Sequence, residues 1–292
     1  MSSSYIAWFN GKFLTEDRIE ISCNDRGFLY GDGLFETMRS IDHKVIGFRA
    51  HMERLRVSCQ ETRIPFDKPV ADLRYVLGEL LKKNQIADAT VRLTVTRGIG
   101  DRFGFGFSDD LKPNWLMQVR PVKEIPESLY EQGVKISLQI SPHFHPARKK
   151  PKVKSLSAME YALAKQSALD DHSYDTVLMD TQENVYEGTS SNLFLFSDGR
   201  LVTPPLKAGI LPGVTRARVL QIARSRLGLT VDERLPSKSE LLGASEVFLT
   251  NTNVDILPVT RCGARKIGIG SAGLMTRQIL ETYRKTLVEI LE

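Results

Sequence analysis

The sequence predicts a mixed α/β protein of two domains, on the basis of three observations. Its 292 residues suit two modest domains and are ample for a hydrophobic core. Segments with the period of a strand alternate along the chain with segments that have the period of a helix. Residues 121–127 hold two prolines and mixed charge, and they interrupt this pattern. We therefore expect a smaller N-terminal domain over 1–120, a linker over 121–127 and a larger C-terminal domain over 128–292.

The first domain is predicted to consist of helices packed on an antiparallel sheet. Asn10-Gly11 is a strong signal for a tight hairpin turn. Pro65 is expected to prevent the helix Arg49–Glu61 from continuing, because proline lacks the backbone N–H that a helix needs. Gly98–Gly106 predicts a glycine-rich loop between two strands. The expected strands are Tyr5–Phe9, Lys12–Leu14, Leu34–Ile41, Thr90–Thr96 and Trp115–Val119, and the expected helices are Arg49–Glu61 and Val70–Lys83.

The second domain is predicted to hold short strands and several helices. Ser237-x-x-Glu240 is a capping box, the pattern that begins a helix. The expected strands are Val134–Ile140, Asp175–Met179, Val185–Tyr186, Leu193–Phe196, Leu201–Thr203, Glu246–Thr250 and Ile256–Thr260. The expected helices are Leu156–Ala168, Val214–Leu227, Lys238–Leu242 and Ala272–Leu291.

Composition and charge argue against several classes of protein. Hydrophobic residues make up 41% of the chain and charged residues 26%, which is ordinary for a soluble globular protein. No apolar run approaches the ~20 residues that span a bilayer, and the N-terminus lacks the regions of a signal peptide. The three cysteines are widely spaced, which predicts a reducing cytoplasm and no disulfide framework. The net charge of +5 suits anionic ligands but is weak support for nucleic acid.

Two features argue against other kinds of site. His143 and His145 would share a strand face, but the further ligands that a metal needs are not evident nearby, so we expect no metal. Gly31-Asp-Gly33 is not a phosphate-binding P-loop, because no Gly-Lys-Ser/Thr follows it.

The most informative stretch is EGTSSNLFLFSDGRLVTPPLKAGILPGVTR, residues 187–216. Glu187 is a single acid among Gly, Thr and Ser, whose hydroxyl and backbone groups can hold it ionised. Gly213–Thr215 bring free backbone N–H groups and a hydroxyl to a helix start, where a phosphate binds well. An acid for a ring nitrogen and a helix start for a phosphate together suggest pyridoxal phosphate.

This stretch resembles the signature of the class IV (fold-type IV) pyridoxal-phosphate aminotransferases. That family includes branched-chain and D-amino-acid aminotransferases and aminodeoxychorismate lyase, and the resemblance runs from about Phe9 to Val259. It implies an α/β architecture of two domains with the cofactor, pyridoxal 5′-phosphate, at their interface. It also implies a homodimer in which each active site borrows residues from the neighbouring subunit.

Lys154 is the lysine that the resemblance assigns to the cofactor. By local sequence alone, the basic residues from Arg148 to Lys154 would be a solvated loop, since basic runs usually are. In the family, however, the cofactor lysine precedes a similar helix start, and Lys154 lies about thirty residues before Glu187, as the family spacing requires. Such a lysine must lose its proton, and Arg148, Lys150 and Lys152 could supply part of the positive field that favours this.

The resemblance also assigns the remaining contacts with the cofactor. Glu187 would hold the pyridine nitrogen protonated, which makes the ring an electron sink. Val214 and Thr215 would bind the phosphate at a helix start, together with Thr252 in a turn after a strand. Arg54 would add a charge-assisted contact to the same phosphate.

The residues that would bind the substrate form a mosaic of two subfamilies. The loop that begins at Arg97-Gly-Ile-Gly resembles the carboxylate-binding loop of D-amino-acid aminotransferases and of the lyase, which implies that Arg102 grips a carboxylate. Tyr30 and Phe35 instead resemble the pocket pair of branched-chain enzymes, and Arg92 matches their strand arginine. We expect a transaminase that favours a D-amino acid, with a branched-chain L-amino acid as the other possible donor.

Two departures keep this assignment open. Gly104 stands where the D-specific enzymes carry a histidine, and Thr90 stands where the branched-chain enzymes carry a tyrosine. One rival function is that of aminodeoxychorismate lyase, which releases pyruvate and 4-aminobenzoate. A more distant rival is a cofactor-free protein that binds an acidic or nucleic-acid partner through the run from Arg148 to Lys154. The expected partners are amino acids and keto acids, with no nucleic acid and no membrane.

Overall fold

The computed structural model describes residues 5–100, 103–144 and 152–292. The chain forms two compact units. Unit 1 comprises Met1–Lys123, Val153–Ala158 and Glu289–Glu292, and unit 2 comprises Glu124–Lys152 and Met159–Val288. The predicted mixed α/β class is confirmed. The division differs from a single split at the linker, because two short segments of the later chain belong to unit 1.

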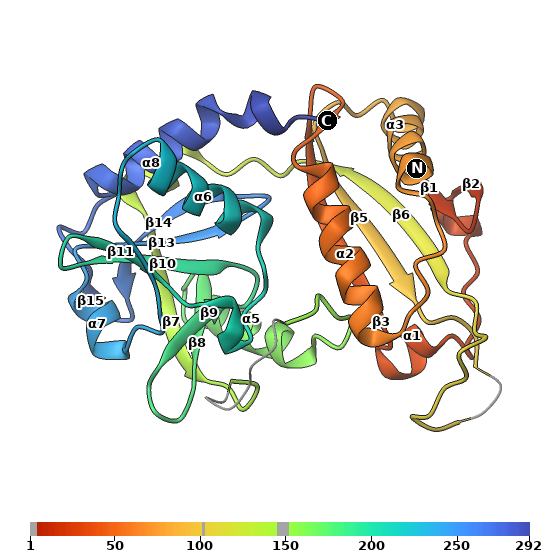
Figure 1. Cartoon of the computed structure of the whole chain (residues 1–292), viewed down its shortest axis with the longest axis horizontal. Coiled ribbons are helices and arrows are strands. Elements are labelled where there is room, and N and C mark those ends of the chain that lie inside the picture. Colours follow the sequence, from red (N-terminus) through yellow and green to blue (C-terminus); the bar gives the residue numbers. More distant parts are fainter. Residues whose placement is uncertain (1–4, 101–102, 145–151) are drawn as a thin grey trace. The chain divides into compact units, whose positions relative to one another are not determined.

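Unit 1 contains one antiparallel sheet. Its strands are β1 (Ile6–Phe9), β2 (Lys12–Thr15), β3 (Gly33–Ile41), β4 (Lys44–Val45), β5 (Ala89–Thr96) and β6 (Asn114–Pro121). They lie in the order β2-β1-β6-β5-β3-β4 (Figure 1). The hairpin turns at Asn10-Gly11, as expected. The C-terminus returns to this unit, where the backbones of Glu292 and Val45 exchange two hydrogen bonds.

The two long helices of unit 1 are α2 (Phe48–Thr62) and α3 (Val70–Asn84), each within a residue of the predicted bounds. Each one buries an apolar stripe, which includes Leu55 in α2 and Leu80 in α3. This stripe is what made both helices predictable from their period. A short helix, α1 (Arg26–Tyr30), was not predicted.

Unit 2 is built on a mixed sheet. Its strands are β7 (Val134–Ile140), β8 (Asp175–Met179), β9 (Val185–Gly188), β10 (Asn192–Ser197), β11 (Arg200–Thr203), β12 (Val231–Glu233), β13 (Glu246–Asn251), β14 (Asp255–Cys262) and β15 (Arg265–Lys266). They lie in the order β12-β11-β10-β13-β14-β7-β8-β9, with β15 beside β14. Strand β9 also pairs with β10, so the path from β10 through β13, β14, β7, β8 and β9 closes on itself.

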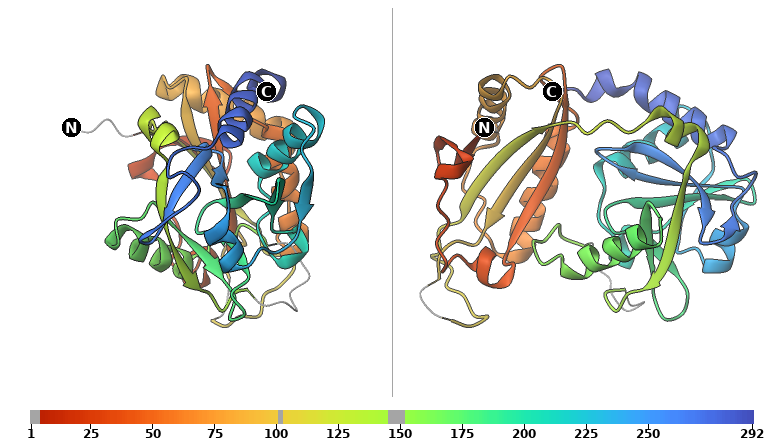
Figure 2. Two further views of the ribbon diagram at one scale, coloured as in Figure 1. Left: turned by 90° about the vertical axis from the view of Figure 1, so that its left-hand side faces the viewer. Right: turned by 180° about the vertical axis from the view of Figure 1, so that it is seen from behind.

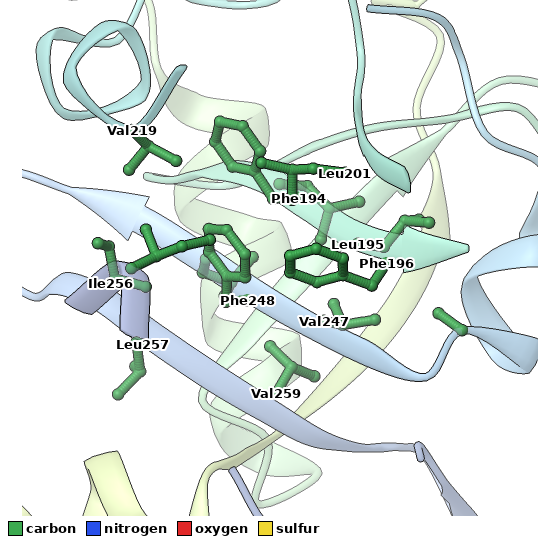
Figure 3. Close-up of a cluster of buried hydrophobic side chains, with 14 of the residues drawn as sticks. Phe194, Leu195, Phe196, Leu201, Val219, Val247, Phe248, Ile256, Leu257 and Val259 are labelled. Atoms are coloured by element: carbon green, nitrogen blue, oxygen red, sulfur yellow. The ribbon is translucent and has the colours of Figure 1, made fainter. Parts of the chain in front are cut away.

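The core of unit 2 lies between these strands and their helices. The rings of Phe194 and Phe248 stack with centroids 5.0 Å apart on neighbouring strands (Figure 3). The helices are α4 (Glu127–Gln132), α5 (Met159–Asp170), α6 (Val214–Ser225), α7 (Lys238–Gly243) and α8 (Leu274–Lys285). Helices α6 and α8 pack against each other and against β13 (Figure 2). Of the helices formed by the described residues, none could span a membrane by length and apolar character.

The C-terminal helix is shorter than predicted. The expected Ala272–Leu291 divides into α8, which ends at Lys285, and a 3₁₀ turn over Leu287–Ile290. The Glu246 carboxylate accepts hydrogen bonds from the Met275 and Thr276 backbones and fixes where α8 begins. Beyond α8 the chain leaves the helix to pair with Val45 in unit 1, a tertiary contact that overrides the local helical pattern.

A buried charged cluster fastens α2 to β3 in unit 1. Arg54 donates from Nε to Oε1 of Glu36 at 2.8 Å, and its Nη2 lies 2.5 Å from Oε2. His51 Nδ1 lies 2.8 Å from the same Oε2, and Glu36 is only 1% exposed. Burial alone would raise the pKa of Glu36, but the charge and hydrogen bonds of Arg54, with those of His51, outweigh it and lower the pKa to about 2.

The wild type is expected to lose stability in acid as Glu36 becomes protonated. Glu36→Gln is expected to remove this part of the loss, because the variant has no carboxylate at that position. The pKa of Glu36 is lower in the folded state than its ordinary 4.5, so its contribution is present above pH 4.5 and is lost as the pH falls toward about 2. The gap in unfolding free energy between wild type and variant should shrink by about 3 kcal/mol across that range.

Tryptophan fluorescence during urea unfolding measures this gap, because both tryptophans, Trp8 and Trp115, are buried in unit 1. Equal pH slopes for the wild type and Glu36→Gln would contradict the assignment of the acid-sensitive charge to Glu36.

Candidate functional site

Glu187 lies where the sheet of unit 2 closes. It lies near the end of β9, is 2% exposed, and stands directly opposite Asn192, the first residue of β10. The turn between the two strands is held by a hydrogen bond from the Gly188 N–H to the Ser191 carbonyl, at 2.8 Å. A methyl group on Gly188 would lie 2.2 Å from Ser191 Oγ and 2.6 Å from Asp175 Oδ2, so a larger residue here would displace one or both of these side chains.

Asp175 supports this turn, a role for which the sequence carries no signal. The buried carboxylate accepts hydrogen bonds from the Thr189 backbone at 3.3 Å and from the Ser191 hydroxyl at 3.0 Å. The Thr189 hydroxyl donates to it as well. Asp175 begins β8, so these bonds join the turn after Glu187 to a neighbouring strand of the closed sheet.

The carboxylate of Glu187 is surrounded by donors. Its Oε2 accepts from Asn192 Nδ2 and from the Leu211 backbone N–H, both at 3.0 Å. Its Oε1 accepts from Lys152 Nζ at 3.1 Å. Three donors, one of them a cation, suit a carboxylate anion, and such an anion is what a protonated ring nitrogen would bind.

The start of α6 lies against the same asparagine. Gly213 is its N-cap, and a methyl group there would lie 2.0 Å from Asn192 Oδ1. Gly213 has no side chain that could cap the helix, and the first N–H groups of a helix, here including those of Val214 and Thr215, have no partner within it. Asn192 therefore contacts both Glu187 and Gly213, the residue before the predicted phosphate-binding residues Val214 and Thr215.

A buried hydroxyl stands on the other side of Asn192. Thr250 in β13 is directly opposite Asn192, so their side chains lie on one face of the sheet. Thr250 is 1% exposed, and among the described residues its Oγ1 has no hydrogen-bond partner. Thr252 follows in the turn in which Asn251 Oδ1 accepts from two backbone N–H groups. Thr250 was not predicted; an orphaned buried hydroxyl has no sequence signal.

In unit 1, Lys154 lies on an extended segment that pairs with β3. Its carbonyl accepts from the Phe35 N–H at 2.9 Å, and its Nζ lies 4.5 Å from the centre of the Phe35 ring. Arg92 Cζ lies 4.0 Å from the centre of the same ring. Burial lowers the pKa of Arg92. The structure thus brings together three predicted residues, Lys154, Phe35 and Arg92.

Arg54 also lies in unit 1, in the charged cluster with Glu36 and His51. Burial is the largest influence on His51 and lowers its pKa, and the charges of Arg54 and Lys154 lower it further. The hydrogen bond and charge of Glu36 oppose this shift without reversing it. Arg54 faces a carboxylate in this cluster; its predicted phosphate contact remains a prediction.

Of the three basic residues expected to contribute to the positive field around Lys154, only Lys152 lies among the described residues. Lys152 does not act as a free positive neighbour, because it pairs with Glu187 in unit 2. Arg148 and Lys150 lie outside the described residues. Arg92, which contacts the same Phe35 ring as Lys154, is a positive neighbour that comes from a distant part of the sequence.

Tyr30 lies beside the predicted substrate loop. Its hydroxyl accepts from the Gly104 N–H at 2.9 Å, and its ring lies 5.6 Å from that of Phe105. Arg26, which was not predicted, donates to the carbonyls of Gly104, Phe105 and Gly106. Arg26, Tyr30 and Phe105 line a cavity of about 290 Å³. Arg102, the predicted carboxylate ligand, lies outside the described residues.

Comparison with known proteins shows which family the chain resembles. The family model "Amino-transferase class IV" matches residues 33–262. A protein of Methanocaldococcus jannaschii, named provisionally as a branched-chain-amino-acid aminotransferase, is 34% identical over 95% of this chain and 94% of its own length. The D-alanine aminotransferase of Bacillus licheniformis is 30% identical over 96% of each chain.

Solved structures agree with the fold. The branched-chain amino acid aminotransferase of Escherichia coli matches with a TM-score of 0.88 and 25% identity, over 97% of this chain and 94% of its own. The branched-chain amino acid aminotransferase of Thermobaculum terrenum in its PLP-form matches with a TM-score of 0.85 and 23% identity, over 99% and 98%. The family match, the two relatives and the buried Glu187 motif together lead to one conclusion: the chain belongs to the class IV aminotransferases.

Proposed function

We propose that the chain uses pyridoxal 5′-phosphate to move an amino group between an amino acid and a 2-keto acid. The observation that carries the proposal is the row of Glu187, Asn192 and Thr250, with the start of α6 packed on Asn192. A buried carboxylate, an uncapped helix start and an orphaned hydroxyl lie together within one unit. The carboxylate suits a protonated ring nitrogen as an acceptor, and the helix N–H groups and the hydroxyl suit a phosphate as donors.

The residues of unit 2 would hold the two ends of the cofactor. Glu187 would hold the proton of the ring nitrogen, and the backbone N–H groups of Val214 and Thr215 would donate to the phosphate. Thr252 would add a hydroxyl, and Arg54 of unit 1 a charge-assisted bond. When bound, pyridoxal phosphate supplies the electron sink that allows an amino acid to lose its Cα proton.

Lys154 would hold the cofactor and move that proton. A lysine does this work as a neutral amine, and nearby positive charge favours the neutral form. The guanidinium of Arg92, on the same Phe35 ring as Lys154, supplies such a charge. The arrangement in unit 1 therefore supports Lys154 as the group that accepts and returns the Cα proton.

The substrate would meet Tyr30, Phe35, Arg92 and Arg102. An arginine suits the substrate carboxylate, because its planar fork can donate two parallel hydrogen bonds. The relatives' names divide between D-alanine and branched-chain substrates, so we propose a D-amino acid as the favoured donor and a branched-chain L-amino acid as the second candidate. A cytoplasmic homodimer is part of the same proposal.

A half-reaction tests this function. The protein loaded with pyridoxal phosphate is yellow, and it is mixed with D-amino acids or L-amino acids in the absence of a keto acid. Loss of the yellow absorption band with formation of the pyridoxamine form is expected, and the fastest donor gives the substrate class. A loaded protein that no donor bleaches, but that releases pyruvate from aminodeoxychorismate, would be the lyase.

Lys154→Ala should remove amino transfer. Loss of the proton-transferring amine is expected to lower the rate by at least about 10²–10⁴-fold. Lys135→Ala is the matched control, since Lys135 is a lysine of β7 that pairs with exposed Asp171. The half-reaction rate of each variant is measured by stopped flow. A Lys154→Ala protein that reacts at the wild-type rate would rule out this role.

Gly188→Ala should weaken cofactor binding. The added methyl group would press on Ser191 and Asp175 and displace the turn that sets Glu187. Overpacking of this kind costs about 1–3 kcal/mol, so we expect a loss of affinity of roughly fivefold to 150-fold, measured by equilibrium dialysis. Gly243→Ala in α7 is the control, because no atom lies within 4 Å of its added methyl group. Equal affinities of the two variants would contradict the role of the turn.

A further inference from the structure

Lys152 forms an ion pair with Glu187, the carboxylate that the proposed function assigns to the ring nitrogen of the cofactor. Its Nζ lies 3.1 Å from Glu187 Oε1, and its side chain is 19% exposed, against 3% for that of Glu187. Its backbone N–H donates to the Ile210 carbonyl at 3.2 Å, which anchors it beside the segment that leads to α6. The Lys152 side chain is thus held at the carboxylate from within unit 2.

Lys152 is a cation in this setting. Burial alone would lower the pKa of Lys152, but the charge of Glu187, together with Tyr161, raises it overall. The centre of the Tyr161 ring lies 3.6 Å from Nζ, where the face of the ring attracts an ammonium group. A protonated, paired lysine is unsuited to a covalent role that needs a neutral amine.

The two oxygens of Glu187 have different partners. Oε2 is bound by two neutral donors, the side-chain amide of Asn192 and the backbone N–H of Leu211. Oε1 is bound by a cation, Lys152. A protonated ring nitrogen is also a cationic N–H donor, so it would require the same kind of contact at the same carboxylate.

We infer that Lys152 is a positioning residue that competes with the cofactor's ring nitrogen for Glu187. This inference rests on the proposed function, since it takes Glu187 as the partner of the ring. Lys152 keeps the buried carboxylate paired before the cofactor arrives and yields Oε1 when the ring nitrogen binds. A long, flexible lysine stem with a partly exposed side chain permits that movement.

The competition has a consequence for affinity. A buried carboxylate without a cation is costly, so Lys152 stabilises the cofactor-free protein. Binding of the cofactor then exchanges the ion pair of Lys152 with Glu187 for one between the ring nitrogen and Glu187. Its binding free energy is therefore smaller than it would be at an unpaired carboxylate. Removing the charge of Lys152 should therefore destabilise the cofactor-free protein and tighten its hold on the cofactor.

The test uses the cofactor-free full chain and pyridoxamine 5′-phosphate, which cannot bond covalently to a lysine. Wild type, Lys152→Met and Lys152→Arg are titrated by calorimetry, with Lys238→Met as control. Lys238 pairs with exposed Glu183, so this control removes the same charge away from Glu187. Failure of the wild type to bind would refute the proposed function itself and, with it, the inference that rests on that function.

With a wild type that binds, Lys152→Met should lower the Kd roughly tenfold, the effect of one charge-assisted hydrogen bond. Lys152→Arg, which keeps the charge, should bind as the wild type does. The analogue whose ring nitrogen is replaced by carbon should gain no affinity from Lys152→Met, because it offers Glu187 no donor. The melting temperature of cofactor-free Lys152→Met should fall, and its rise on loading should exceed that of the wild type.

Three results would overturn the inference. Unchanged or weaker binding by a folded Lys152→Met would mean that Lys152 supports the site and does not compete in it. Equal tightening in Lys238→Met would reduce the effect to overall charge. Equal tightening for the analogue without a ring nitrogen would place the effect away from Glu187.

Discussion

The pairing of β9 with β10 is the constraint on which the site in unit 2 depends. It sets Glu187 opposite Asn192, and the next pairing sets Asn192 opposite Thr250. Gly188 allows the chain to turn within contact of buried Asp175, which holds that turn. The start of α6 then packs on Asn192, so the acid and the helix N-terminus are placed by one sheet register and not by a flexible loop.

The two lysines at positions 152 and 154 illustrate how environment divides their roles. They are two residues apart, yet Lys152 belongs to unit 2 and Lys154 to unit 1. Lys152 has a carboxylate partner and stays charged, which suits an ion pair. Lys154 lies by the ring of Phe35, which also contacts the guanidinium of Arg92. The described contacts that distinguish the two lysines, with Glu187 and with Phe35, come from elsewhere in the chain.

The parts of the fold and site that could be predicted are those encoded locally in the sequence. Helices α2 and α3 followed from their apolar period, and the start of α6 near Val214 followed from one motif, while the cofactor contacts of Glu187, Val214 and Thr215 stay predictions. Contacts between distant residues were not predictable. The ion pair of Lys152 with Glu187 spans 35 residues, and the shortened α8 reflects the return of the C-terminus to unit 1.

The most direct test of the account identifies the lysine that bonds to the cofactor. Borohydride reduction of the protein loaded with pyridoxal phosphate makes the bond permanent, and a protease that leaves residues 152–154 in one peptide allows fragmentation to locate the added mass. We predict the mass on Lys154 and none on Lys152. A label on Lys152 would contradict both the assignment of the covalent lysine and the role of Lys152 as the counter-ion of Glu187.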